Sequence, residues 1–129
     1  MVVMQIEELN KECQTMQEFL EITCTDDPDG LIGRLADLNV YLARSGKLLA
    51  DLKFEKDKQV SSFIKANEER IAMLPASVSN KLINAETSEC NYYVNWLDRI
   101  NRSLVHVGDN MRTQLSFIKE ELKLTKNGY

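Results

Sequence analysis

Apolar residues recur along this chain at steps of three and four, the spacing that places side chains on one face of an α-helix. The longest such run lies between positions 31 and 74 and contains no proline. Its apolar members are Leu31, Leu35, Leu38, Leu42, Leu49, Leu52, Val60, Phe63, Ile64, Ile71 and Leu74. We therefore predict one long helix over residues 31–74, which needs packing partners along its whole length.

A second run of this kind precedes the long one. It consists of Val2, Ile6, Leu9, Cys13, Met16 and Leu20, which alternate in steps of four and three. That alternation is typical of a coiled-coil seam and predicts a helix over residues 2–22. Residues 25–30 then form an Asp/Pro/Gly turn signal, with Asp29 as the expected N-cap of the next helix. Because this connection is short, the two helices should be antiparallel neighbours.

After the long run, proline marks the next boundary. Pro75 should end the long helix near Leu74. A short helix is predicted over residues 77–85, with Ser77 or Ser79 as its cap.

The last helix is predicted over residues 88–124, with Thr87 or Ser88 as its cap. Its apolar face comprises Cys90, Tyr93, Leu97, Ile100, Leu104, Val107, Met111, Leu115, Ile118 and Leu122. Neither glycine nor proline occurs at positions 76–107, so one unbroken helix across both segments remains the alternative.

Three places interrupt the apolar pattern. Ser45 and Gly46 stand where the seam of the long helix would carry another leucine, and residues this small permit a close approach of a second helix or mark a bend. The seam also loses its apolar residues near positions 53–62, where we expect a distortion. In the last helix a four-residue step around Gly108 indicates either a bend or a closely packed partner.

Composition agrees with an all-α fold. The 129 residues include only two prolines and five glycines, and the length suits one domain with one core. We expect a single elongated antiparallel helical bundle, coiled-coil-like, with three long helical segments and one short helix. No window reaches the ~18 apolar residues of a membrane span, so no membrane association is expected.

The cysteines indicate the cellular location of the protein, and the charges indicate how its helices pack. Cys13, Cys24 and Cys90 have no paired spacing, which argues against disulfides and zinc and favours a reducing, cytoplasmic location. Cys13 and Cys90 are expected to be buried as small hydrophobic residues. The first thirty residues carry eight acidic side chains and one lysine, whereas the remainder is mildly basic. This asymmetry indicates complementary packing between helices, or an acidic helix that covers a basic face meant for a partner.

Enzyme chemistry is not expected. His106 is the single histidine, and the chain contains no glycine-rich phosphate loop, no nucleophile elbow and no HExxH motif. Adjacent acidic residues, such as Glu120 and Glu121, do not face each other on a helix. We therefore predict no catalytic residue, no metal site and no cofactor.

One face of the last helix combines aromatic, cationic and imidazole side chains. It comprises Tyr92, Trp96, Arg99, Arg102 and His106. Such a face can bind a protein partner, or it can stack nucleic-acid bases and contact phosphates. In a purely structural interpretation, Trp96 caps the core while the two arginines pair with acids of the first helix or with Asp98.

Two blocks, residues 41–51 and 95–102, resemble sequences of small helical proteins of unknown function from phages and prophages. The first reads YLARSGKLLAD and the second NWLDRINR, and the likeness extends from Leu31 to Leu122. Such proteins are often encoded among phage replication and recombination functions. The resemblance thus implies an accessory role beside single-stranded DNA or its binding proteins, without any catalytic residue.

Together these features predict a non-enzymatic helical interaction or assembly protein. The resemblance implies that it is derived from a phage or prophage and lies in the cytoplasm of a bacterial host cell. Rods this long with narrow seams leave one side under-covered, so self-association as a two-fold dimer is expected. A further protein partner is possible. The alternative function is an accessory nucleic-acid-binding protein in phage replication or recombination.

Overall fold

The computed structural model describes residues 5–22 and 27–126, which form five helices and no strand. These are α1 (Ile6–Glu21), α2 (Pro28–Ala66), α3 (Glu68–Ala72), α4 (Ala76–Glu86) and α5 (Ser88–Lys126). The all-α class expected from the helical period is confirmed. Among the described residues, no helix combines the length and apolar character needed to cross a bilayer.

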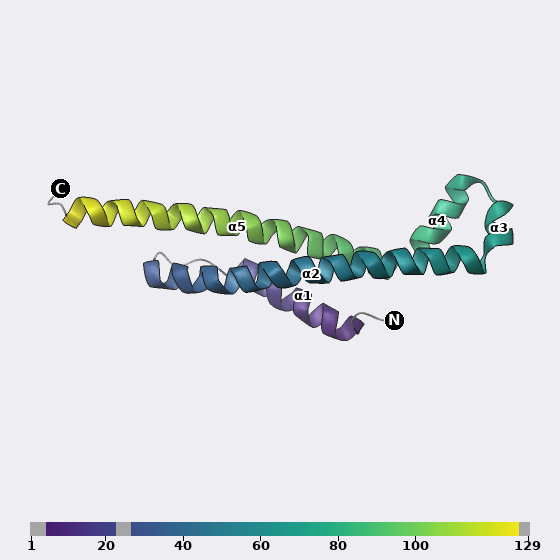
Figure 1. Cartoon of the computed structure of the whole chain (residues 1–129), viewed down its shortest axis with the longest axis horizontal. Coiled ribbons are helices and arrows are strands. Elements are labelled where there is room, and N and C mark those ends of the chain that lie inside the picture. The colour runs from purple at the N-terminus through teal and green to yellow at the C-terminus, as the bar shows by residue number, and fades with distance from the viewer. Residues whose placement is uncertain (1–4, 23–26, 127–129) are drawn as a thin grey trace.

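Helices α2 and α5 lie side by side along most of an elongated molecule (Figure 1). Near the start of α5, the Cys90 thiol donates to the carbonyl of Leu52, 3.5 Å away. Further along, Gly108 lies against Leu38. Because residue numbers fall in α2 as they rise in α5, the two helices are antiparallel.

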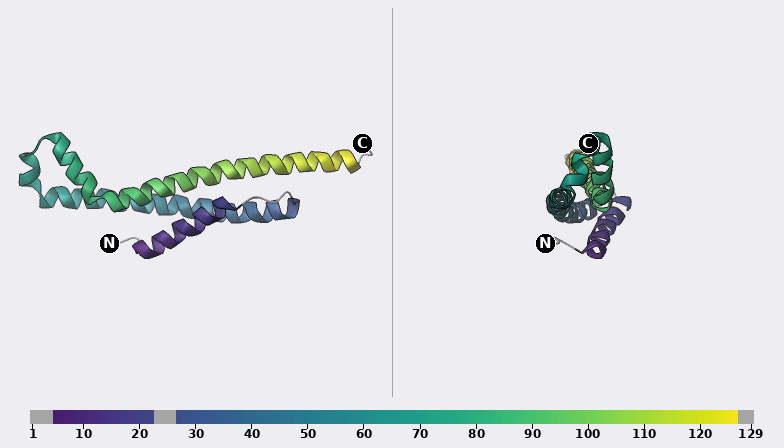
Figure 2. Two further views of the ribbon diagram at one scale, coloured as in Figure 1. Left: turned by 180° about the vertical axis from the view of Figure 1, so that it is seen from behind. Right: turned by 90° about the vertical axis from the view of Figure 1, so that its right-hand side faces the viewer.

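The remaining helices cover different parts of this pair. α1 crosses one side of α2 and α5 at an angle, and its C-terminal end lies nearest the start of α2 (Figure 2). α3 and α4 form a hook at the far end of α2 and lead the chain back to α5 (Figure 1). No helix lies against the C-terminal end of α5 in either figure.

The core follows most of the predicted seams, but in α2 Leu48 is buried where the prediction had its neighbour Leu49, which is only partly buried. Its buried members are Leu9, Cys13, Met16, Leu31, Leu38, Leu48, Tyr93, Leu97, Ile100, Leu104, Met111 and Leu115. They come from α1, α2 and α5, so α1 completes a three-helix contact over the central part of the molecule.

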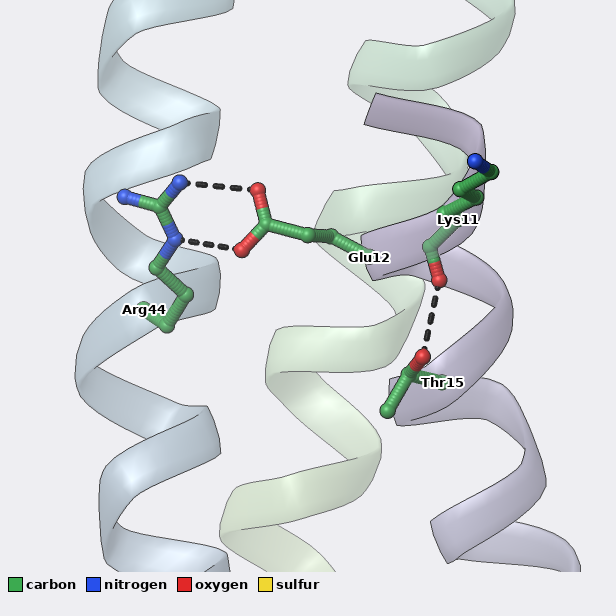
Figure 3. A network of polar contacts seen from close by, with 4 residues as sticks. All are labelled: Lys11, Glu12, Thr15 and Arg44. Atoms are coloured by element: carbon green, nitrogen blue, oxygen red, sulfur yellow. Dashed lines mark hydrogen bonds and ion pairs between the residues drawn. The ribbon is translucent and has the colours of Figure 1, made fainter. Parts of the chain in front are cut away.

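Polar contacts fix α1 to α2. Glu12 accepts two hydrogen bonds from Arg44, at 2.6 Å from Nε and 2.7 Å from Nη2 (Figure 3). At the other end of α1, Arg34 donates to the carbonyls of Phe19 and Ile22, at 2.7 and 3.0 Å. The last turn of α1 has no basic residue of its own, so Arg34 of α2 supplies the cation that a helix C-terminus favours.

The start of α2 differs from the expectation. The N-cap is Asp27, whose carboxylate accepts from the Gly30 amide at 3.0 Å, and Pro28 is the first helical residue. Asp29 lies within the first turn instead. Proline suits this first position because its missing N–H would have no partner there.

The expectation of one helix over residues 31–74 is wrong at Asn67, which separates α2 from α3. The Asn67 side chain donates to the carbonyl of Phe63 at 2.9 Å, and its backbone amide bonds to Ile64. An asparagine that bonds to the backbone of its own segment competes with the helical ladder. The distortion expected at residues 53–62 is also absent, since α2 stays α-helical there.

The segment after Pro75 forms two helices, with Thr87 between them. α4 extends one residue further at each end than predicted and has Pro75 as its N-cap, without a side-chain cap from Ser77 or Ser79. The Thr87 hydroxyl donates to the carbonyl of Ile83 at 2.9 Å, which helps to end α4. α5 then continues without a break through Gly108 to Lys126.

Candidate interaction surfaces

The aromatic part of the predicted face joins α5 to α1. The Trp96 indole donates to Gln17 at 3.1 Å, and the Tyr93 hydroxyl accepts from Asn10 at 2.9 Å. The rings of Tyr93 and Trp96 stack with centroids 6.3 Å apart. Trp96 is half-buried and contacts α1 through its bond to Gln17, whereas Tyr92 beside it is exposed.

The polar members of the predicted face lie in solvent. Arg102 pairs with Asp98 at 3.1 Å, one helical turn away, as the structural interpretation anticipated. Arg99 and His106 are exposed, and Arg99 forms no ion pair with another described residue. The face is therefore divided into a part that packs on α1 and an exposed strip with one unpaired guanidinium.

At the predicted close-packing site, Ser45 makes the close contact. It is fully buried, and its hydroxyl accepts from Asn101 at 2.9 Å. A methyl group at Gly46 would meet only Asn101, at an ordinary 3.8 Å. The tight glycine is Gly108, where a methyl group would lie 3.2 Å from the side chain of Leu38.

The thiols of Cys13 and Cys90 are both free and buried, as expected. Burial raises the pKa of Cys13 to about 11, and the neighbouring carboxylate of Glu12 acts in the same direction. Burial likewise raises the pKa of Cys90. A thiol held in its protonated form is a poor nucleophile and a poor metal ligand. Cys24 lies outside the described residues.

The C-terminal end of α5 projects beyond the other described helices, which we did not predict from the sequence. Residues 119–126, which we name the tail, are all exposed. Leu122 continues the seam of Met111, Leu115 and Ile118, yet 59% of its surface is accessible. The signal in the sequence was the apolar seam of the last helix, which extends beyond the residues that the start of the long helix can cover.

A hollow of about 380 Å³ lies where α1, α2, α4 and α5 meet. Its apolar wall includes Leu9, Leu48 and Leu52. Its charged residues are Asp51, Glu55, Glu86 and Glu89. We name this hollow the acidic groove. The sequence could not indicate it because its residues come from four separate helices.

The described residues contain no group of three or more histidine, cysteine or acidic side chains that could hold a metal ion. Comparison with family models, with curated proteins and with solved structures finds no match to this chain.

Proposed function

We propose that this chain is a non-enzymatic helical interaction protein that acts through self-association, as a two-fold dimer. The observation that carries the proposal is the exposure of apolar side chains at the C-terminal end of α5. Leu122 stands on the seam that packs the rest of α5, but 59% of it is accessible to solvent. Phe117 and Leu124 nearby are also exposed, at 67% and 53%. Phe117 and Leu124 are seven positions apart and lie on the side of α5 away from Leu122, so apolar side chains are exposed on two sides of this projecting helix end, as is typical of an interface.

In this proposal the dimer completes a coiled-coil-like antiparallel bundle. α5 passes the start of α2, so no other described helix lies beside its last turns (Figure 1). A second copy can supply the missing helix, and two-fold symmetry lets both copies gain the same contact.

Sedimentation velocity and light scattering over a range of concentrations test the proposal. We expect a dimer at micromolar concentration, and Leu122→Ser should shift the equilibrium toward the 14.8 kDa monomer. Leu122 is exposed, so this change should leave the helical circular dichroism of the monomer intact. Thr125→Ser, a mild change on the exposed tail, is the matched control. A monomer at every concentration of the unchanged chain would refute the proposal.

Phage or prophage derivation is part of the proposal and rests on the two blocks at residues 41–51 and 95–102. A role as an accessory nucleic-acid-binding protein is the second candidate. Its support is the exposure of Tyr92 and Arg99, which lie two helical turns apart on one side of α5, since an aromatic ring and an unpaired guanidinium on one face suit a single strand.

Binding of fluorescent single-stranded DNA at two salt concentrations tests the second candidate. Phosphate contacts predict an affinity that falls steeply as salt increases, and Arg99→Ala should weaken binding. Lys65→Ala, which removes one exposed cation on α2, controls for net charge. No binding at low salt would exclude this candidate.

A further inference from the structure

The tail presents an apolar residue and three cations on one side of α5. Lys119 lies three positions before Leu122 and four before Lys123, and Lys126 lies three positions after Lys123, so all four side chains fall on one side of the helix. None of these lysines forms an ion pair within the described part of the chain. The two acids of the tail, Glu120 and Glu121, fall on its other sides.

The acidic groove offers the opposite charge. Glu86 and Glu89 on its rim are exposed and have no ion-pair partner among the described residues. A third carboxylate, Glu55, holds Lys58 only loosely, at 3.9 Å, and its Oε2 atom is buried without a hydrogen-bond partner. A buried carboxylate oxygen in this state is stabilised by an added cation.

We propose that the tail of one copy of this chain docks in the acidic groove of a second copy. Leu122 then packs against the apolar wall of Leu48 and Leu52, while the lysines meet the carboxylates of the rim. This inference rests on the proposed self-association and names the surfaces that carry it.

The positions of the tail and the acidic groove allow each copy to dock its tail in the groove of the other. The groove lies at Cys90 near the start of α5, and the tail lies near its end. At 1.5 Å per residue, Cys90 and Leu122 are roughly 48 Å apart along one helix. When two copies lie antiparallel about an axis near His106, each tail reaches the groove of the other. A closed dimer with two identical contacts follows.

Charge reversal on each surface tests the inference by sedimentation equilibrium. We expect Lys119→Glu with Lys123→Glu, and separately Glu86→Lys with Glu89→Lys, each to raise the dimer dissociation constant at least about tenfold. All four residues are exposed, so folding is preserved. Lys65→Glu with Lys81→Glu makes the same charge change as the tail variant, on exposed parts of α2 and α4, and should have little effect.

Mixing the two reversed variants is the decisive measurement. Within either variant alone, the lysine or glutamate side chains at positions 119 and 123 of the tail and at positions 86 and 89 of the rim carry the same sign, but between the two variants these pairs are again attractive. An equimolar mixture should therefore form a dimer with an affinity close to that of the unchanged chain, which a misfolded variant could not do.

Failure to rescue would overturn the inference, and so would charge reversals that leave dimerisation unchanged. If only the groove variant weakens dimerisation, another segment occupies the groove and the inference is again wrong. Concentration-dependent polymers in place of a dimer would contradict the mutual exchange. If the unchanged chain is always monomeric, the proposed self-association itself fails, and the two failures are thus distinguishable.

Discussion

Two glycines in the long helices have opposite surroundings. At Gly108 the missing side chain makes room for Leu38 of the facing helix, 3.2 Å from where a methyl group would stand. At Gly46 the nearest atom to such a methyl group belongs to Asn101 and is 3.8 Å away. The energetic cost of glycine in a helix interior is therefore offset by packing only at Gly108.

We predict that Gly46→Ala stabilises the protein by up to about 1 kcal/mol, because alanine has the better helix propensity and meets no obstacle. Gly108→Leu should destabilise it by about 1–3 kcal/mol, because the added atoms collide with Leu38. Urea unfolding followed by circular dichroism measures both. A loss of stability in Gly46→Ala equal to that in Gly108→Leu would contradict this assignment.

Among the elements, α2 depends on its first turn. Asp27 accepts from the amide of Gly30 at 3.0 Å, while Asp29 stands inside the turn. We predict that Asp27→Ala lowers the free energy of unfolding by about 1 kcal/mol. Asp29→Ala, the matched change two residues later, should cost only about 0.3–0.5 kcal/mol through the helix dipole. If thermal melts show a larger loss of stability for Asp29→Ala than for Asp27→Ala, then Asp29 is the N-cap of α2 and this assignment is wrong.

The docking of α1 on α5 depends on Trp96, which bonds to Gln17 and stacks on Tyr93. We predict that Trp96→Ala destabilises the protein by about 1–3 kcal/mol, less than for a fully buried tryptophan. Arg102→Ala should cost less than about 0.5 kcal/mol, because its ion pair with Asp98 is exposed and lies within one helix.

Measuring stability and partner binding together separates the two roles of this face. If Arg102→Ala leaves the melting temperature unchanged but removes binding of a partner, then Arg102 contacts that partner. A variant of Trp96 that loses binding only in proportion to its lost stability would leave the tryptophan with a structural role alone.

In the molecule as a whole, burial is concentrated where α1, α2 and α5 overlap. α3 has no buried residue, and the tail is exposed throughout. Stability within one protein follows such differences, because a segment with few buried contacts opens without unfolding the rest.

We predict that amide hydrogen exchange is slowest between Leu97 and Met111 and fastest, within α5, in residues 119–126. Raising the protein concentration should protect the tail and leave residues 97–111 unchanged, since the tail and the acidic groove gain contacts in the proposed dimer and the buried centre of α5 does not. Mass spectrometry at two concentrations measures this. Equal protection of the tail at high dilution and at high concentration would argue against a role for it in assembly.

Sequence determined the elements and their inner faces. Steps of three and four from Leu97 to Leu115 predicted core positions that the structure buries, because a helix repeats every 3.6 residues whatever its surroundings. Pro75 likewise placed a boundary, since proline removes a donor and restricts the residue before it. These are local effects, and each can be evaluated within a few residues of the chain.

The break at Asn67 lay beyond this kind of reasoning. It involves neither glycine nor proline, and asparagine can remain inside a helix when packing favours it. Nor could the sequence distinguish Gly46 from Gly108, because the difference lies in Leu38 and Asn101 on the facing helices. Such choices depend on the register between α2 and α5, which no single helix contains.

Tertiary structure alone decided which parts of the seams find a partner within the chain. Leu115 and Leu122 belong to one continuous apolar face, yet the first is buried and the second exposed. Helix α2 begins opposite the part of α5 between these two leucines, so it covers Leu115 but not Leu122. Residues from four helices enclose the acidic groove. Periodicity states which side of a helix is apolar, whereas the relative lengths and register of packed helices determine how much of that side remains free to bind.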